Sequence, residues 1–463
     1  MPNKDINRIA IIGGGISGLS TAWFLHQKGV HVRLFEGNER VGGVIDTDRG
    51  ERFTVERGPN STLQRPGREE DGLGRLIAGI GLEDRAAEAA KAAKKRFVMR
   101  GGRLVALPGS PPGMITTSLF SWRAKLRLLG EPFVGRAEEE ETIAQFVERR
   151  LGREFLDYAV EPFVSGVYAG DPGNLSVRAA VPRVYALEER FGSLIGGAIK
   201  MGKAAEKSGA PAGRLVSFDK GMAVLPETIA AGLPDGTIRT GCRVSGLEQV
   251  EGGWRVDWES AGEKGSEKAD RVVLAVPAPI AADLVEPLSA PAAGILRGIP
   301  YAPILSVAVA YGRDQVGHAL DGFGFLVPRR EGLRILGGLF SSTLFAGRAP
   351  DGKVLLTVFI GGATDPAAID LDAKQAAELV HGELAPLLAI TGEPTVVGQS
   401  RHKGAIPQYT MGHLERMAEL DGLLSAFPGL HARASWQGGI SVSDCVRNGE
   451  IMAHSLVEPG AGT

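Results

Sequence analysis

The spacing of apolar and polar residues at the start of the chain predicts a strand, a helix and a second strand. Residues 8–12 form an apolar run that ends at a cluster of glycines, which is typical of a buried parallel strand. Residues 18–28 carry apolar residues at helical spacing, and Gly29 is suited to end that helix. The next apolar run, residues 30–36, closes with Glu36. This order predicts one βαβ unit with an acid at the tip of its second strand.

The same reading predicts elements along the rest of the chain. Helices are expected at 73–95, over most of 123–204 with a loop at 165–172 and an apolar face along 183–204, at 372–390 and at 444–457. Strands are expected at 214–218, 237–259, 271–277, 303–311, 323–327, 334–340 and 353–360. The strands near residues 9, 32, 240 and 272 are expected in one nucleotide-binding sheet, and those between 303 and 360 in a separate antiparallel sheet. Only residues 458–463 are expected to form a disordered tail.

Composition narrows the classes of function. The chain has 463 residues, enough for two or three domains, and its 52 basic and 54 acidic residues give a net charge of −2. This balance argues against nucleic-acid binding, which needs a strong positive field. Cys242 and Cys445 are the only cysteines, so neither a disulfide framework nor a metal site is expected. A reducing, cytoplasmic location is predicted.

Two stretches without Asp, Glu, Lys or Arg, residues 9–27 and 104–122, raise the question of membrane spans. The first contains the glycine cluster and the second contains three prolines, so neither suits a regular spanning helix. The second stretch leads into aromatic and basic residues between 120 and 127. These favour either an interfacial helix on anionic lipid or a helical lid packed on the protein itself.

The glycines after the first strand have the spacing of a nucleotide-binding loop. Gly13 allows a tight turn, Gly15 lets the backbone approach a pyrophosphate, and Gly18 lets the helix pack close to the sheet. Glu36 is suited to accept hydrogen bonds from a ribose diol. A glycine-rich turn without a nucleotide is the alternative, and the flanking strand, helix and acid argue against it.

Two later segments favour FAD over NAD. Arg40 and the pair Gly42 and Gly43 resemble the extended FAD fingerprint of amine-oxidase-like flavoproteins, although a hairpin turn is an alternative for the pair. Residues 438–449 resemble the C-terminal flavin segment of the same proteins, where the start of a helix faces the flavin. Asp444 is expected to cap this helix. Residues 434–438 and Ser441 depart from the usual residues, so flavin contact there is expected mostly through the backbone.

A series of further segments occurs in the order found in one family: residues 56–61, 95–98, 162–172, 217–221, 322–328, 339–342, 359–362 and 406–413. On these segments, nearly the whole chain resembles the protoporphyrinogen oxidases, oxygen-dependent flavoenzymes of late haem synthesis, and their relatives that make coproporphyrin III. The implied fold class is α/β (α+β overall), with a Rossmann-like FAD-binding domain, an antiparallel-sheet substrate domain and a helical membrane-associating subdomain. The implied boundaries are 1–84, 206–282 and 402–463 for the first, 85–103 and 283–401 for the second, and 104–205 for the third.

The resemblance implies a role for individual residues. Those expected to bind FAD are Gly13, Gly14, Gly15, Ile16, Ser17, Gly18, Glu36, Gly37, Arg40, Gly42, Gly43, Val44, Gly58, Pro59, Asn60, Ser61, Val244, Ser435, Ile440, Ser441 and Val442. Those expected to bind substrate are Asn60, Arg96, Gly166, Gly324, Leu326, Leu339 and Phe359. Arg96 is expected to pair with a propionate, and the backbone of 166–169 to lie near the pyrrole nitrogens. Ordinary core positions for the apolar residues, and a solvated arginine for Arg96, are the alternatives.

The implied reaction is the oxidation of protoporphyrinogen IX to protoporphyrin IX, with dioxygen as acceptor and hydrogen peroxide as product. No set of catalytic side chains converges in the sequence, which fits chemistry carried by the flavin. Coproporphyrinogen III oxidation, an amine or phytoene-type flavin oxidase, and a flavin-free carrier like the Rab escort proteins are the alternatives. The resemblance also leaves open a homodimer, hand-off to a ferrochelatase, and contact with the inner face of the cell membrane.

Overall fold

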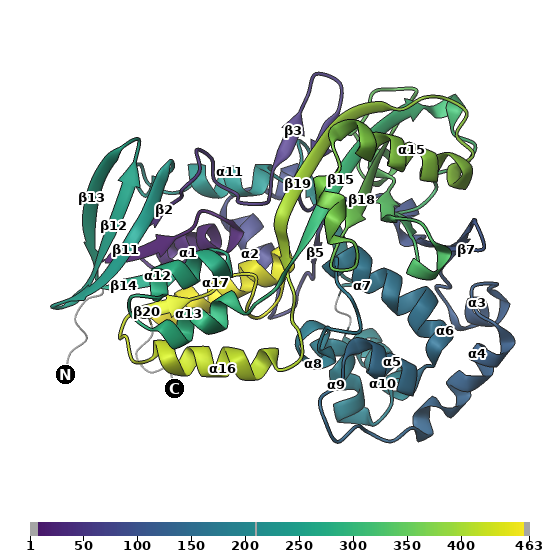
Figure 1. The fold of residues 1–463 in the computed structure, drawn as a ribbon, viewed down its shortest axis with the longest axis horizontal. Coiled ribbons are helices and arrows are strands. Elements are labelled where there is room, and N and C mark those ends of the chain that lie inside the picture. Colours follow the sequence, from purple (N-terminus) through teal and green to yellow (C-terminus); the bar gives the residue numbers. More distant parts are fainter. Residues whose placement is uncertain (1–7, 209–210, 458–463) are drawn as a thin grey trace.

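The computed structural model describes residues 8–208 and 211–457, and its mixed architecture confirms the predicted fold class. Figure 1 shows a parallel sheet with its helices at the left, a second large sheet at the upper right, and a helical unit at the lower right. The predicted tail at 458–463 lies outside the described residues. Within the described ranges no helix is long and apolar enough to cross a membrane.

The first sheet is parallel and has its helices on both faces. Its strand order is β10 (Ile238–Arg239), β2 (His31–Phe35), β1 (Arg8–Ile12), β14 (Arg271–Leu274) and β20 (Leu430–Ala432). Ile9 and Ile11 of β1 face a core shared with α1 (Ile16–Gln27) and α17 (Val442–Val457). Ala10 and Ile12 face the opposite core, which contains α12 (Ala278–Val285), α13 (Ala290–Arg297), α16 (His413–Leu424) and part of the small sheet β11–β12–β13 (Cys242–Val250, Gly253–Ser260, Glu263–Ala269).

The second large sheet has seven strands and is antiparallel apart from one parallel pair, β16 and β7. Its order is β19 (Thr395–Pro407), β15 (Tyr301–Gly312), β18 (Lys353–Gly361), β17 (Ile335–Leu339), β16 (Gly324–Leu326), β7 (Phe97–Arg100) and β8 (Arg103–Ala106). Helix α15 (Ala373–Leu388) packs on one face through Ala376, Val380, Leu384 and Leu388. The strands predicted between 303 and 360 are all present.

The helical unit is built from short elements and lies below the second sheet (Figure 1). They are α3 (Pro111–Thr116), α4 (Trp122–Arg127), η3 (Leu128–Phe133), α5 (Ile143–Arg150), α6 (Arg153–Phe155), η4 (Leu156–Val160), α7 (Glu161–Tyr168), α8 (Val177–Ala180), α9 (Pro182–Phe191) and α10 (Leu194–Ser208). The predicted division into domains stays a prediction. Helix α13 nevertheless packs in the core of the first sheet, beyond the boundary expected at residue 282.

Three predicted elements were wrong in extent. The helix expected at 73–95 is limited to α2 (Gly72–Gly79), because the chain turns at Gly81 (φ 65°) and residues 86–88 pair with β9 (Arg214–Phe218) instead. The loop expected at 165–172 begins later, since α7 continues to Tyr168 and ends at Ala169 with φ 49°. The helix expected along 183–204 is broken at Gly192, which has φ 69°.

Strand β19 was not predicted from the sequence. Its residues are mostly exposed or half-buried and include Gln399, Arg401 and Lys403, so the strand lacks an alternation of apolar and polar positions. It pairs with β15 at one edge of the seven-stranded sheet and then leads toward the helices of the first sheet (Figure 1). The strand therefore joins the two halves of the molecule.

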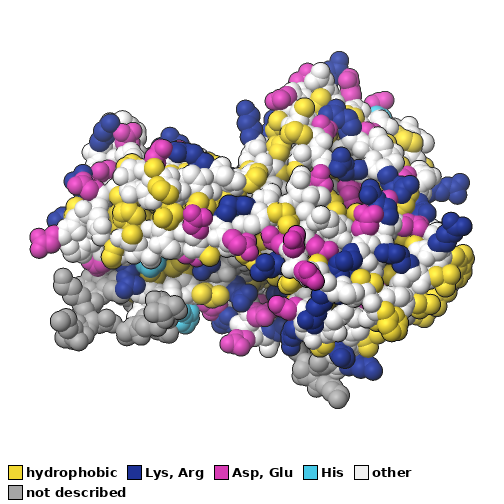
Figure 2. Space-filling model, turned by 60° about the horizontal axis from the view of Figure 1, so that its bottom comes forward, with side chains coloured by type: hydrophobic (Ala, Val, Ile, Leu, Met, Phe, Trp, Pro, Cys, Tyr) yellow, Lys and Arg dark blue, Asp and Glu magenta, His cyan; other side chains and the backbone are white. Residues whose placement is uncertain are grey.

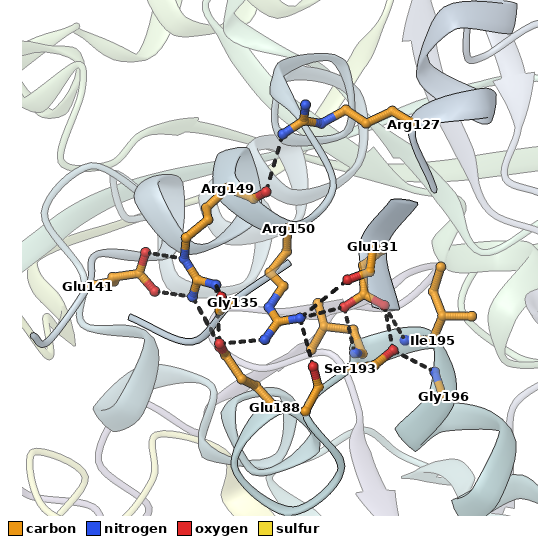
Figure 3. Close-up of polar contacts among 12 residues, drawn as sticks. Arg127, Glu131, Gly135, Glu141, Arg149, Arg150, Glu188, Ser193, Ile195 and Gly196 are labelled. Atoms are coloured by element: carbon orange, nitrogen blue, oxygen red, sulfur yellow. Dashed lines mark hydrogen bonds and ion pairs between the residues drawn. The ribbon is translucent and has the colours of Figure 1, made fainter. Parts of the chain in front are cut away.

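A buried cluster of charged side chains holds the helical unit together (Figure 3). The fully buried Arg150 guanidinium, at the end of α5, contacts Glu131 of η3 at 3.1 Å and Glu188 of α9 at 2.5 Å. Glu131 also accepts hydrogen bonds from Ser193 Oγ at 2.5 Å and from the amide of Leu194 at 2.8 Å. Because buried charges are stable only when they are paired, the cluster depends on every member.

Replacement of Arg150 by methionine is expected to destabilise the protein by about 3–5 kcal/mol, because Glu131 would stay buried without a cation and Glu188 would keep only Arg149 as its cation. Urea unfolding measures the change. The control is Arg153→Met, which removes exposed ion pairs to Glu148 and Asp157 and is expected to cost less than about 1 kcal/mol. Equal losses for the two variants would contradict the importance of the buried cluster.

Candidate functional site

The two glycine segments predicted to bind a dinucleotide lie side by side at the start of α1. The amide of Gly42 donates to the carbonyl of Gly14 at 2.8 Å, and Gly15 and Gly42 form an isolated parallel bridge. A Cβ atom on Gly43 would lie 3.3 Å from the Cα of Gly15. The structure thus places the two glycine segments in contact, which their positions along the sequence alone did not show.

The glycines of the first loop differ in whether the surrounding structure leaves room for a side chain. Gly13 has φ +108°, and a Cβ there would lie 2.6 Å from the carbonyl oxygen of Ala275. A Cβ on Gly18 would lie 1.9 Å from the carbonyl oxygen of Gly13, so helix and loop touch through their backbones. At Gly15, by contrast, no described atom lies within 4 Å of that position. Open space at the N-terminus of α1, which has no side-chain cap in the described structure, fits an approaching pyrophosphate.

Glu36 is buried, and its carboxylate is already oriented by the loops around it. One oxygen accepts from the amide of Gly14 at 2.7 Å, and the other accepts from the amide and side chain of Asn38 at 2.8 and 2.6 Å. The carbonyl of Glu36 accepts from the amide of Cys242 at 2.8 Å, so β11, which carries Val244, begins beside the acid. The role of Asn38 was not predicted from the sequence.

The side chain of Arg40 stabilises the second glycine segment by hydrogen bonds to its backbone. Its guanidinium donates to the carbonyls of Val41 at 3.0 Å, Gly43 at 2.8 Å and Ile45 at 3.2 Å. The predicted contact of Arg40 with a phosphate stays a prediction. The structure gives this side chain a second reason to be an arginine, because a planar group with several donors fits three carbonyls.

The start of α17 lies beside the start of α1. A Cβ on Gly449 would lie 2.4 Å from Ser20 Oγ, which shows how closely the helices pack. The thiol of Cys445 lies beside Ser17, and burial raises the pKa of this thiol to about 11. The first turn of α17 therefore lies beside the first turn of α1, into which the first glycine loop leads.

The predicted helix cap at Asp444 was wrong. The helix begins at Val442, and Ser441 Oγ accepts from the amide of Asp444 at 3.1 Å. Ser441 therefore caps α17, while Asp444 lies in the first turn and accepts from the Ser441 hydroxyl at 2.5 Å. Ser and Asp are both favoured at helix N-termini, so only the exact start of the helix decides between Ser441 and Asp444.

Residues 58–61 connect the glycine loops to the second sheet. A Cβ on Gly58 would lie 1.9 Å from the carbonyl oxygen of Val44, so the two predicted segments contact through their backbones. Asn60 donates to the carbonyl of Gly58 at 3.3 Å and lines a small hollow with Thr357 and the buried Arg348. The hollow thus lies between the first loops and strand β18.

The predicted apolar substrate residues share one face of the seven-stranded sheet. Leu326 lies opposite Gly337, which lies opposite Phe359, and in the next row Gly324 lies opposite Leu339. Residues opposite each other across strands project from the same face. Leu326, Leu339 and Phe359 are half-buried, whereas their neighbours Phe325 and Val358 are buried on the face that α15 covers. Leu326 and Leu339 pack against small buried clusters, but this face of the sheet is less covered than the opposite one.

The packing of the neighbouring strand explains why residue 324 is a glycine. It has φ +150°, and a Cβ there would lie 2.2 Å from the carbonyl oxygen of Gly338. Its expected contact with substrate stays a prediction.

Helix α7 approaches the half-buried face. A Cβ on Gly166 would lie 2.4 Å from Cδ2 of Leu326, so these two predicted substrate residues are in contact. Phe163 and Val167, on the same side of α7 as Gly166, are 43% and 44% exposed. Neither residue was predicted from the sequence, although their spacing from Gly166 places them on the same face of the helix.

The end of α7 is fixed by two hydrogen bonds. The carbonyl of Tyr168 accepts from Gln408 Nε2 at 2.8 Å, and that of Ala169 accepts from the amide of Ala363 at 2.7 Å. The amides of Ala169 and Gly170 both turn back to the carbonyl of Val164. The carbonyls of residues 165–167 therefore accept no hydrogen bond from the amides of Ala169 and Gly170. The carbonyls of Tyr168 and Ala169, by contrast, already accept from Gln408 and Ala363.

Arg96 borders the same face. Its guanidinium lies 5.2 Å from the ring centre of Phe323, and Phe323 and Leu339 pack on one small cluster that includes Phe345. The neighbouring Lys95 pairs with Asp321 at 2.7 Å, but Arg96 has no ion pair among the described residues. An exposed, uncompensated cation therefore lies at the edge of the apolar face.

Comparison with known proteins places these features in context. The profile of the family named flavin containing amine oxidoreductase matches residues 16–454. A chloroplastic protoporphyrinogen oxidase of Nicotiana tabacum is 34% identical, with 96% of this chain and 84% of the relative covered. A coproporphyrinogen III oxidase of Bacillus subtilis (strain 168) is 27% identical, with 96% of both covered.

Solved structures share the fold. A crystal structure from Exiguobacterium sp. 255-15, provisionally named a protoporphyrinogen oxidase, has a TM-score of 0.81 at 24% identity and covers 98% of this chain and 99% of its own. A putrescine oxidase variant has a TM-score of 0.68 at 18% identity, with 97% and 98% covered.

Replacement of Gly15 by alanine is expected to abolish FAD binding while the FAD-free protein keeps its thermal stability. The new methyl group meets no described atom, but it enters the space left open for the pyrophosphate. FAD titration and the melting temperature of the FAD-free protein measure the two effects. The matched variant Gly18→Ala is expected to lower the melting temperature itself, because its methyl group overlaps the Gly13 carbonyl. Retained FAD binding in Gly15→Ala would contradict the assignment of this loop.

Proposed function

Because the chain belongs to the flavin-containing amine oxidoreductase family, and within it to the protoporphyrinogen and coproporphyrinogen oxidase group, we propose that it oxidises protoporphyrinogen IX to protoporphyrin IX. The protein binds FAD. Dioxygen is the proposed acceptor and hydrogen peroxide the proposed product, in porphyrin and haem biosynthesis. The residues proposed to form the FAD site are 13–18, 36, 37, 40, 42–44, 58–61, 244, 435 and 440–442.

The observation that supports the substrate class is the half-buried sheet face with a free cation at its edge. A porphyrinogen is a broad apolar ring with carboxylates on its rim, so it needs apolar walls and a cation at one border. Leu326, Leu339 and Phe359 supply the wall, and α7 supplies a second apolar surface through Phe163 and Val167. Arg96 is positioned to receive a propionate.

The groups of the protein itself position the substrate and exclude water from it. The carbonyls at residues 165–167 are suited to accept hydrogen bonds from pyrrole N–H groups, since they lie on the wall contacted by Leu326. Asn60 links the substrate face to the loops assigned to the cofactor. When bound, FAD supplies the redox chemistry, which removes six electrons from the substrate in three two-electron steps and passes them to dioxygen.

Coproporphyrinogen III is the second candidate, because one similar relative is named for it. Its two additional propionates are negatively charged, so its binding would require further cations at the edge of the substrate face. Arg329 and Arg330, which follow β16, are already paired with Asp171 at 3.7 Å and Asp157 at 2.7 Å. This pairing favours protoporphyrinogen IX as substrate.

The remaining alternatives are less well supported. An amine oxidase would require an aromatic cage, whereas the half-buried face here is largely aliphatic, with Phe359 its one aromatic residue among those assigned. The flavin-free carrier is less well supported, because the family that the chain matches is flavin-containing.

The proposal is tested by turnover of the two porphyrinogens, followed by porphyrin fluorescence. The purified, FAD-loaded protein is expected to form fluorescent porphyrin from both in the presence of dioxygen, with the higher kcat/KM for protoporphyrinogen IX. A reversed preference would assign the coproporphyrinogen reaction instead. Absence of oxidation of either compound would overturn the proposed function.

The matched variants for this assay are Arg96→Ala and Lys94→Ala. Loss of the Arg96 guanidinium is expected to raise KM by roughly 10-fold or more with little change in kcat, because a charge-assisted hydrogen bond is lost on binding. Lys94 is an exposed neighbouring cation, so its loss is expected to leave KM within about twofold. An unchanged KM in Arg96→Ala would contradict the propionate assignment.

We also propose that the helical unit contacts anionic membrane surfaces. Apolar side chains of α3, α4 and η3 are exposed, including Leu129 at 72% and Phe133 at 89%. Figure 2 shows hydrophobic side chains gathered at its right edge, on the side where α4 lies in Figure 1. Exposed Arg123 and Arg127 supply positive charge beside them, as an interfacial segment requires. Buried Glu131 holds η3 in place through Arg150.

Flotation with anionic liposomes tests this surface. The wild-type protein is expected to float, and the double variant Leu129→Asp, Phe133→Asp is expected to bind at least tenfold more weakly, because two charges would enter the apolar contact. Ile280→Asp changes an apolar residue on α12 that is 42% exposed, and this control should float like the wild type. A wild-type protein that stays in the soluble fraction would favour a helical lid.

A further inference from the structure

Tyr409 lies in the segment that connects the second sheet to α16, and its hydroxyl joins two points of the C-terminal cofactor loop. The hydroxyl donates to the carbonyl of Ser435 at 2.6 Å and accepts from the amide of Gly439 at 2.9 Å. The side chain is buried, with 4% of its surface exposed. Both ends of the turn at 435–439 are therefore tied to one oxygen atom.

This turn leads directly into the part of the chain assigned to FAD. Gly439 has φ +126°, and Ser441 and Val442 follow as the cap and first residue of α17. Ser435 and Gly439 are half-buried, and an amide or carbonyl left unpaired there costs free energy, so loss of the hydroxyl would release the turn from its observed geometry. The residue acts on the cofactor through this backbone.

The phenol ring itself is fixed by a neutral partner. The ring of His413 stacks on it, with centroids 4.2 Å apart and an angle of 10° between the planes. Burial lowers the pKa of His413 to about 4, so the imidazole carries no charge near neutral pH. Burial also raises the pKa of Tyr409, so its hydroxyl keeps the proton that it donates to Ser435.

The neighbouring residues connect the same segment to the substrate side. Gln408 donates to the carbonyl of Tyr168 at the end of α7, and the carbonyl of Tyr409 accepts from the amide of Ser176 at 2.9 Å. Residues 408 and 409 therefore contact both the loop after α7 and the loop before α17. This segment resembles the corresponding segment of the porphyrinogen oxidases, but no role for Tyr409 was predicted from the sequence.

We propose that Tyr409 is a positioning residue for FAD, whose hydroxyl sets the 435–439 turn so that the start of α17 meets the cofactor. The proposal concerns cofactor binding, so it does not depend on which porphyrinogen, if any, the protein oxidises. Its test needs no substrate, and failure of the proposed function would leave the outcome unchanged.

The test is titration of FAD-depleted Tyr409→Phe protein with FAD, followed by flavin fluorescence and by the visible absorption spectrum. The variant removes one oxygen atom and keeps the ring. Its Kd for FAD is expected to rise roughly 5- to 30-fold, the factor for one or two lost hydrogen bonds, and its bound flavin is expected to show a shifted visible band.

A matched variant separates this role from general stability. Tyr311→Phe removes a buried hydroxyl that contacts His381 in the second sheet, far along the chain from the assigned FAD residues. This variant is expected to bind FAD within about twofold of the wild type. Unchanged FAD affinity and spectrum in Tyr409→Phe, an equal loss in Tyr311→Phe, or failure of Tyr409→Phe to fold without FAD would overturn the proposal.

Discussion

The close approach of backbone to backbone around the first glycine loop is the constraint on which the site depends. Gly18 touches the Gly13 carbonyl, Gly42 bonds to Gly14, and Gly58 abuts the Val44 carbonyl. No side chain larger than hydrogen fits at Gly18 or Gly58, so these segments can meet only where glycine stands. The remaining loops and α17 are packed around that contact.

The sequence could predict this part because its signals are local. A strand, a glycine spacing, a helix and an acid each have a direct physical reason, and together they identified Gly13, Gly15, Gly18 and Glu36. Arg40 shows the limit of such reasoning. Its charge suggested a phosphate, but its bonds to three carbonyls depend on how the loop closes, which no spacing reveals.

The second sheet and the helical unit were harder to predict. Leu326, Leu339 and Phe359 have the composition of core residues, and only strand register shows that they share the less covered face. The edge strand β19 lacks the apolar alternation that identifies a strand. Two helix ends depend on single residues: the positive φ of Gly192 ends one helix, and the hydroxyl of Ser441 caps the start of another. The spacing of apolar residues along a helix does not locate such ends.

The order of strands in the parallel sheet has a consequence for synthesis on the ribosome. Strand β1 is made first, but its neighbour β14 and the edge strand β20 come from the middle and near the end of the chain. Translation of most of the polypeptide must therefore precede closure of this sheet, while β1 and β2 wait with an unpaired edge. Nascent chains of this topology are expected to need protection by chaperones until β14 emerges, and truncated products should aggregate rather than accumulate as folded fragments.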